Sequence, residues 1–241
     1  RRMLLPAWPR GTETGGDVRA LAEAPDGHLW LSIAGAGVRR FDPASGQTQA
    51  LHQDSALPAS LPEEAIGPLL IDRAGLLWVG GQLHGVAVAD SRGARFRYLV
   101  DADGNGPHPH VLDHSIRAVL QTADHRLWLG TDDSRLLRYD IARGFEDFSR
   151  LLPTPAGQRA APRVMAFAAA TDGMPWVATT AGLYRLDPAI PALHPVAIPG
   201  VDAPALRSIA IGRDGTLWLG TNDAGLVRFK PDDRHPIGEV R

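Results

Sequence analysis

The sequence contains no cysteine, a single lysine and no long hydrophobic run. The absence of cysteine excludes disulfide frameworks and cysteine-ligated metal sites. No apolar run approaches the ~20 residues that a membrane-spanning helix needs, so we expect a membrane to be involved only through segments absent from this chain. The formal net charge is −2, so we expect no nucleic acid as a partner. Because Lys230 is the only lysine, nearly all positive charge is carried by arginine, which can bind carboxylates or phosphates through two parallel hydrogen bonds.

The beginning of the chain lacks two features of a newly made secreted protein. It opens Arg1-Arg2-Met3, with neither an initiator methionine nor the apolar segment of a signal peptide. It ends at Arg241, shortly after a repeated segment. We therefore expect the chain to be an excised part of a longer protein.

What the sequence does contain is a repeat. Five tryptophans recur at spacings of 48, 50, 48 and 42 residues, and a period in this range is typical of stacked supersecondary units. They are Trp30, Trp78, Trp128, Trp176 and Trp218. A tryptophan repeated in every unit is better explained by packing between units than by sugar stacking. The aspartates around the repeated turn are likewise interpreted as turn formers rather than catalytic acids: Asp26, Asp72, Asp172 and Asp214.

Each repeat has the pattern of three short strands and a less regular fourth. Asp-Gly pairs supply positive φ for a tight turn between the first two strands. Glycines open the third strand in four repeats, and the fourth strand is predicted at positions such as 47–52, 95–100 and 146–152. Four antiparallel strands in a unit of ~45 residues are typical of a propeller blade. The predicted fold class is therefore an all-β propeller, with blades near residues 18–65, 66–115, 116–163, 164–205 and 206–241, and residues 1–17 as a candidate closing outer strand.

These residues also resemble a known family. The pattern Asp-x-x-Gly-x-Leu-Trp-Leu-Gly-Thr followed by Gly-Leu-x-Arg-Phe resembles the two-component regulator propeller repeat, most closely at Leu206–Lys230 and next at Ile116–Asp140. The second and fourth copies depart, since Gly81 replaces the usual threonine and Val177-Ala178-Thr179 lacks the glycine. Sensors of this family carry more than five repeats, so the resemblance implies either a five-bladed ring or part of a seven-bladed propeller.

The resemblance implies a non-enzymatic function. Such propellers are similar to the periplasmic input modules of membrane-bound bacterial receptors, which continue into a transmembrane helix and a histidine kinase or a GGDEF-type diguanylate cyclase. The implied partners are a small molecule or an oligosaccharide, with association into homodimers. No cofactor is implied.

Arginine is found at one equivalent position of three repeats. Arg19, Arg117 and Arg207 stand just inside the first strand, where Gly67 and Met165 occupy the other repeats. In a ring, first strands line the central channel, so we expect these arginines to converge at its mouth and to bind an anionic ligand. The alternative is that they are solvated or paired with nearby aspartates. Further candidate ligand-binding residues are Arg163, His84, His114, Asp132 and Asn222.

Residues 101–106 resemble the first half of an EF-hand calcium loop. Asp101, Asp103 and Asn105 alternate as oxygen ligands before a glycine, but position twelve is Leu112 rather than glutamate. A plain turn explains the segment equally. Transition-metal binding by the nearby His108, His110 and His114 is disfavoured, because the two intervening prolines break a regular strand.

Two other function classes remain open. One is a propeller enzyme, similar to streptogramin lyases or to carbohydrate-active enzymes, for which His84 and His114 with Asp132 or Asp133 are the nearest acid–base set. The chain has no nucleophile elbow, phosphate loop or HExxH motif. The other class is an interaction scaffold that binds a protein through one face. We expect the sensor in preference to both.

Overall fold

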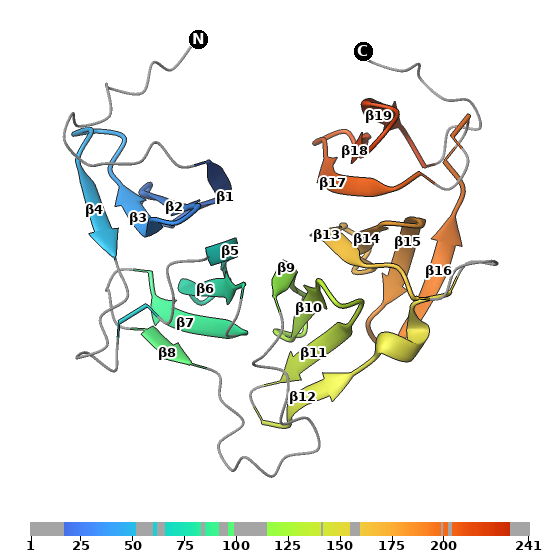
Figure 1. Cartoon of the computed structure of the whole chain (residues 1–241), viewed down its shortest axis with the longest axis horizontal. Coiled ribbons are helices and arrows are strands. Elements are labelled where there is room, and N and C mark those ends of the chain that lie inside the picture. Colours follow the sequence, from blue (N-terminus) through green and yellow to red (C-terminus); the bar gives the residue numbers. More distant parts are fainter. Residues whose placement is uncertain are drawn as a thin grey trace. The chain divides into compact units, whose positions relative to one another are not determined.

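A computed structural model describes residues 17–51, 60–61, 66–82, 85–91, 96–98, 115–140, 142–154, 160–198, 200–201 and 204–231. These residues form five antiparallel sheets of three or four strands, as expected for propeller blades, and the predicted fold class is confirmed (Figure 1). The chain divides into two compact units. One contains the first two sheets and the other contains the remaining three, and each unit is described by itself. No helix of the described residues has the length and apolar character needed to cross a membrane.

The first unit holds two four-stranded sheets. Their strand orders are β1-β2-β3-β4 and β5-β6-β7-β8, so each sheet is a simple meander. The strands are β1 (Val18–Glu23), β2 (Leu29–Ile33), β3 (Gly37–Phe41), β4 (Thr48–Leu51), β5 (Ile66–Ile71), β6 (Leu76–Gly81), β7 (Val86–Asp90) and β8 (Phe96–Tyr98). A cluster of buried side chains from both sheets, among them Trp30, Val38, Ile66, Leu77 and Val79, joins the two blades.

The second unit holds three sheets, ordered β9-β10-β11-β12, β13-β14-β15-β16 and β17-β18-β19. The strands of its first sheet are β9 (Ile116–Gln121), β10 (Leu127–Thr131), β11 (Leu136–Asp140) and β12 (Gly144–Asp147). Those of its second are β13 (Val164–Ala168), β14 (Trp176–Thr179), β15 (Gly182–Asp187) and β16 (Ala192–Val196), and those of its third are β17 (Leu206–Ile211), β18 (Leu217–Thr221) and β19 (Leu226–Phe229). The first strands pack side by side, with β13 between β9 and β17.

The repeated tryptophans pack between blades. Trp30, Trp78, Trp128 and Trp176 are 0–7% exposed, and Trp128 and Trp176 belong to clusters that also contain side chains of the next sheet. Burying such large aromatic side chains dominates the stability of a core. Trp30, Trp128 and Trp176 therefore contribute to the packing between neighbouring sheets.

An arginine faces the tryptophan across the second and third strands in four sheets. The register pairs are Trp30 with Arg40, Trp128 with Arg138, Trp176 with Arg185 and Trp218 with Arg228. The guanidinium carbons of Arg138, Arg185 and Arg228 lie 5.5, 4.2 and 5.3 Å from the tryptophan ring centroids. Each pair combines a cation–π contact with coverage of the ring. The arginine of the repeated motif is thus a structural residue.

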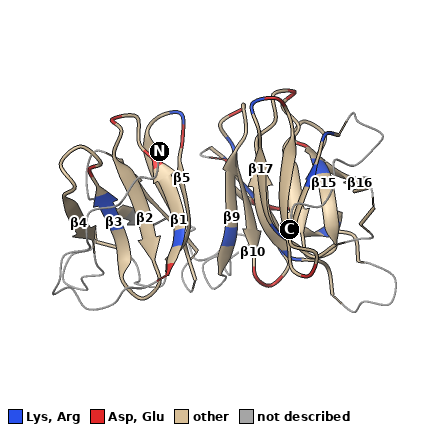
Figure 2. Cartoon of the chain, turned by 90° about the horizontal axis from the view of Figure 1, so that it is seen from above, with Lys and Arg blue, Asp and Glu red and all other residues tan. Residues whose placement is uncertain are grey.

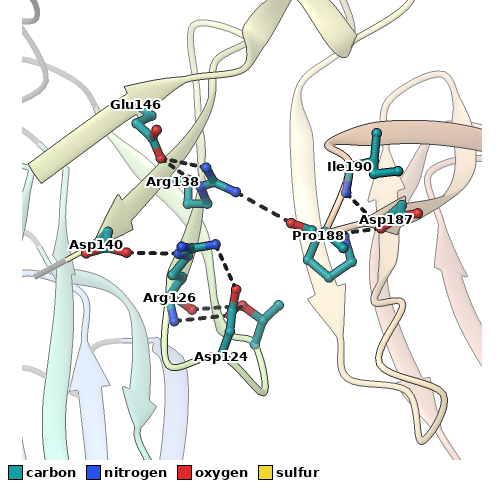
Figure 3. Close-up of polar contacts among 10 residues, drawn as sticks. Asp124, Arg126, Arg138, Asp140, Glu146, Asp187, Pro188 and Ile190 are labelled. Carbon is teal, nitrogen blue, oxygen red and sulfur yellow. Dashed lines mark hydrogen bonds and ion pairs between the residues drawn. The ribbon is translucent and has the colours of Figure 1, made fainter. Parts of the chain in front are cut away.

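Arg138 also joins two blades of the second unit (Figure 3). Its guanidinium binds Glu146 at 2.7 Å and reaches the carbonyl of Pro188 in the next sheet at 3.5 Å. Nearby, Arg126 binds Asp124 and Asp140, at 3.1 and 2.9 Å. The hydrogen bond to Arg126 lowers the pKa of the Asp140 carboxyl below its ordinary value. Each carboxylate in this cluster already has a cationic partner, so we interpret the cluster as structural.

The fourth strand of the third sheet is shorter than predicted. The expected strand at 146–152 is wrong in both bounds, because β12 spans Gly144–Asp147 and Ser149–Leu151 form a 3-10 helix, η2. Asp147 Oδ1 accepts the Ser149 N–H at 2.8 Å, which starts the helical turn. Phe148 lies between the two elements and packs on Trp128, with ring centroids 5.3 Å apart. Phe148 thus packs on the repeated tryptophan at the point where the strand ends and the 3-10 helix begins.

The predicted turn residues behave as expected. Asp26, Asp172 and Asp214 each accept the backbone N–H two residues later through Oδ1. Gly27, Gly75, Gly173 and Gly215 occupy the turn position three residues before the tryptophan, with φ of 80–83°. In the third sheet this position is His125, with φ 64°.

We expect the substitution His125→Gly to stabilise the protein. A side chain in the left-handed region costs about 1 kcal/mol, partly offset by the greater freedom of glycine in the unfolded chain. The free energy of unfolding should rise by about 0.5 kcal/mol, which urea denaturation can measure. The matched control is Gly173→His, which should lower it by a similar or larger amount. A less stable His125→Gly variant would contradict the strain argument.

Candidate ligand-binding rim

The position predicted to carry arginine is a β-bulge. Register shifts between the first and second strands leave residues 19, 117, 165 and 207 without a cross-strand partner, and an equivalent irregularity spans 66–69. A bulge redirects the side chain of the extra residue away from the regular alternation. Arg19, Arg117 and Arg207 are accordingly exposed. The bulge was not predicted from the sequence. It changes only which residues pair across the two strands, and this pairing cannot be read from the residue pattern.

The bulged residue meets the residue that lies four positions after the tryptophan. Arg117 Nε donates to Asp132 Oδ1 at 2.9 Å. Arg207 donates to Asn222 Oδ1 from Nε at 3.1 Å and from Nη2 at 2.8 Å. The same position is Thr180 in the fourth repeat and Ala34 in the first. Arg19 therefore has no side-chain acceptor at this position.

Asp132 binds a second arginine from the next blade. Arg163, which precedes β13, donates from Nη1 to Asp132 Oδ1 at 3.2 Å. The Arg163 N–H is held by Thr180 Oγ1 at 3.0 Å, which fixes the start of the strand. One carboxylate oxygen thus joins two adjacent sheets through Arg117 and Arg163. Thr180 was absent from the sequence-based candidates, although it shares the position of Asp132 and Asn222 in the repeat.

The hydrogen bond from Arg117 lowers the pKa of the Asp132 carboxyl below its ordinary value, desolvation opposes this, and the charge of Arg163 adds to the lowering. A lowered carboxyl pKa means that the native state favours the ionised form. The stabilisation is present above the ordinary aspartate pKa of about 3.9 and is lost as the pH falls through the lowered value. All three side chains are 37–45% exposed, so the contribution to stability is small.

We define the arginine rim as Arg117, Asp132, Arg163, Arg207 and Asn222, all in the second unit. Because β13 packs between β9 and β17, these residues stand at the same end of three successive first strands. Asp132 offsets one of the three positive charges, and Arg207 is bonded to a neutral amide. The rim therefore retains exposed guanidinium groups that can bind an anion bidentately. The other charged residues of the described chain are divided between the turns at the ends of the sheets and the strands themselves (Figure 2).

Several predicted site residues are not brought to the rim. Arg19 belongs to the other unit, so its convergence with Arg117 and Arg207 stays a prediction. His84, His114 and the calcium candidates Asp101, Asp103 and Asn105 lie outside the described residues. Within the described part, no group of three or more histidine, aspartate or glutamate side chains could hold a metal ion. Calcium binding likewise stays a prediction.

The predicted acid of the enzymatic alternative is already engaged. Asp132 is bound by two arginines, and Asp133 accepts from Thr131 Oγ1 at 2.5 Å and from Arg135 Nε at 3.2 Å. A carboxylate with a lowered pKa stays ionised at neutral pH, so Asp132 is a poor proton donor. The described geometry adds no support to a catalytic role for these residues.

Comparison with known proteins identifies one repeat and the fold. Residues 110–133 match the family model described as the two-component regulator propeller, which confirms the resemblance seen in the sequence. No curated protein sequence matches this chain significantly.

Solved structures share the propeller fold at low identity. The extracellular domains of BT4673 and BT3049 from B. thetaiotaomicron, both described as hybrid two component systems, match with TM-scores of 0.72 and 0.70 at 17% and 18% identity. The matches cover 97% and 91% of this chain but only 28% and 29% of those chains. Virginiamycin B lyase from Staphylococcus aureus matches with a TM-score of 0.65 at 14% identity, over 91% of this chain and 71% of the lyase. The chain thus spans less than a third of the length of the signalling domains that it resembles.

Proposed function

We propose that this chain, which carries a two-component regulator propeller repeat, is part of an extracytoplasmic sensor of a bacterial signalling receptor. It binds an anionic small molecule or oligosaccharide at the arginine rim, in the periplasm, and passes the signal to a separate kinase or diguanylate cyclase domain. The repeat match and the signalling proteins among the structural neighbours support the receptor assignment.

The observation that carries the ligand assignment is the pairing of Arg207. Its guanidinium donates twice to Asn222 Oδ1, an oxygen without formal charge. The Asn222 amide in turn donates to Asp223 at 2.9 Å, so this carboxylate reaches Arg207 only through the neutral amide. Arg117 and Arg163, in contrast, already share a carboxylate. Arg207 is therefore the arginine of the rim that gains most from an incoming anion.

The proposal can be tested with an acidic and a neutral oligosaccharide of equal length. Trigalacturonate and maltotriose serve as probes, with binding measured by isothermal titration calorimetry at low and moderate salt. We expect measurable binding of trigalacturonate only, weakened by salt as for any exposed charge pair. Arg207→Gln should weaken it at least tenfold, since a lost charge-assisted hydrogen bond is worth about 1.5–3 kcal/mol.

Arg213→Gln is the matched control. Arg213 is an exposed arginine of the same sheet, in the turn between β17 and β18 at the opposite end of the strands, so its loss should leave binding unchanged. Binding of trigalacturonate that is equally weakened by both substitutions would reduce the rim to a nonspecific charge effect. Equal binding of maltotriose would contradict an anionic ligand while leaving the sensor assignment open.

A further inference from the structure

The arginine rim carries an acidic residue at a position that is uncharged in every other repeat. The residue four positions after the tryptophan is Ala34, Gln82, Asp132, Thr180 or Asn222 in the five copies. The second and third strands also pair in the sheets that have threonine or asparagine there. The repeat therefore does not require a carboxylate at this position, and Asp132 needs an explanation that is specific to the third sheet.

Asp132 occupies two arginines that an acidic ligand would otherwise bind. Its Oδ1 accepts from Arg117 Nε at 2.9 Å and from Arg163 Nη1 at 3.2 Å. The two guanidinium groups come from neighbouring sheets, and paired cationic donors of this kind are a usual way to bind a carboxylate. All three side chains are 37–45% exposed, so the pair is open to solvent. The Asp132 side chain thus takes the place that an acidic group of a ligand would take.

Arg207 lies one sheet further along and is bonded to the neutral Asn222 Oδ1. Its strand, β17, packs against β13, the strand that Arg163 precedes. Stacked sheets lie about 10 Å apart. A ligand with two acidic groups at about that separation is therefore long enough to bind Arg207 with one group and to approach Arg163 with the other.

A second acidic group on the ligand nevertheless gains little next to Asp132. It has to replace the Asp132 carboxylate on the same guanidinium groups, so the bonds formed are of the same kind as the bonds lost. The displaced carboxylate is tethered nearby, and it is ionised at neutral pH because the hydrogen bond from Arg117 lowers its pKa. Two like charges at short range repel each other, and such repulsion is a means of rejecting an unwanted ligand.

We propose that Asp132 is a specificity-determining residue that limits the rim to ligands with a single acidic group, bound by Arg207. This inference rests on the proposed anion-binding function of the rim. The ligand class is a small molecule or an otherwise neutral oligosaccharide with one carboxylate, such as a single uronate. Further acidic groups on a polyuronate add no affinity. If Asp132 only joined the two sheets, its loss would affect stability and not this selectivity.

Two trisaccharides test the selectivity by isothermal titration calorimetry. Trigalacturonate has a carboxylate on every sugar, whereas a trisaccharide of two xyloses and one glucuronate has a single one. We expect the parent chain to prefer trigalacturonate by no more than about threefold, the statistical advantage of three carboxylates that bind one at a time. In Asp132→Asn, this preference should rise at least tenfold, because Arg117 and Arg163 become free to bind a second carboxylate.

The preference is the informative quantity, because removing one negative charge strengthens the binding of any anion. Asp124→Asn is the matched control, since it removes an exposed carboxylate from the same sheet, in the turn between β9 and β10 at the opposite end of the strands. It should leave the preference unchanged. Adding Arg163→Gln to Asp132→Asn should remove most of the gain. The urea midpoint should change little in Asp132→Asn, because its ion pairs are exposed.

The outcomes separate this inference from the function on which it rests. A preference for trigalacturonate far above threefold in the parent chain would overturn the role of Asp132 while leaving an anionic ligand at the rim. An unchanged preference in Asp132→Asn would do the same. Absence of binding of both trisaccharides would contradict the anionic ligand itself, and this inference with it.

Discussion

The substitution Gly130→Ala is expected to lower the free energy of unfolding by about 2–3 kcal/mol, the usual cost of overpacking a core. A Cβ at this position would lie 2.6 Å from Val164 Cβ, 2.7 Å from Val164 Cγ1 and 3.1 Å from the Val164 carbonyl oxygen. Val164 begins the first strand of the next sheet and is fully buried. Since two of the three atoms belong to a short branched side chain and the third to the backbone, relief requires the two blades to separate.

Chemical denaturation of the purified protein measures this effect, and Gly220→Ala is the matched control. Gly220 is the equivalent glycine of the fifth sheet, but the atom closest to its added Cβ is the Ser208 hydroxyl oxygen, which can rotate away. Its replacement should cost less than 1 kcal/mol. A double variant Gly130→Ala/Val164→Ala should recover part of the stability through the space released. Equal losses for the two glycines would refute the interblade clash.

The position two residues after the tryptophan shows which structural requirements can be predicted from the repeat and which cannot. The second residue after the tryptophan is Ser32, Gly80, Gly130, Ala178 and Gly220 in the five copies. The repeated pattern Trp-Leu-Gly-Thr is by itself compatible with a turn at these glycines, directly after the second strand. In the structure, glycine is required at position 130 for a different reason. Gly130 lies within β10, and the absence of a side chain leaves space for the neighbouring sheet. This requirement for glycine arises from contacts between repeats, which cannot be predicted from the residue spacing within one repeat.

The strands and turns could be predicted because each depends on local chemistry. Alternating apolar residues, Asp-Gly turns and the tryptophan period are sufficient to define β-strands of ~5 residues and their order. The end of β12 could not be predicted, because the 3-10 helix after it depends on Asp147 accepting the Ser149 N–H. From the sequence alone, Glu146 and Phe148 on either side of Asp147 are equally compatible with a longer strand.

The candidate site was predictable only in part. Equivalent positions in the repeat identified Arg117 and Arg207, and Asp132 and Asn222 were named without their pairing. The shared carboxylate between Arg117 and Arg163 could not be predicted, since it joins residues 46 positions apart across a blade boundary. It leaves Arg207 as the arginine with no directly bonded carboxylate in the described rim, and the proposed anion site is centred on Arg207 for that reason.

Asp72 is expected to be the most sensitive aspartate of the described chain, and Asp72→Ala should cost about 3 kcal/mol of unfolding free energy. Its Oδ1 accepts the backbone N–H groups of Ala74 and Leu76, both at 2.9 Å, and its Oδ2 accepts the indole N–H of Trp78 at 2.8 Å. The side chain is buried, so water cannot replace these bonds. The sequence analysis interpreted Asp72 as a turn former like Asp214, which describes only half of its role.

Two variants separate the turn from the indole contact. Asp72→Asn keeps an oxygen for the backbone N–H groups but places an amide donor against the Trp78 N–H, so it should cost about half as much as Asp72→Ala. Asp214→Ala, the control, removes an exposed turn former and should cost less than 1 kcal/mol. Urea denaturation gives the three free energies, and the indole N–H resonance of Trp78 should shift in both Asp72 variants only. An Asp72→Asn variant as stable as the parent would show that the turn alone accounts for Asp72.

The indole bond is the more informative of the two contacts. Trp30 and Trp128 have no acceptor for their indole N–H among the described residues. Asp72 therefore gives the second blade a buried hydrogen bond that those two blades lack.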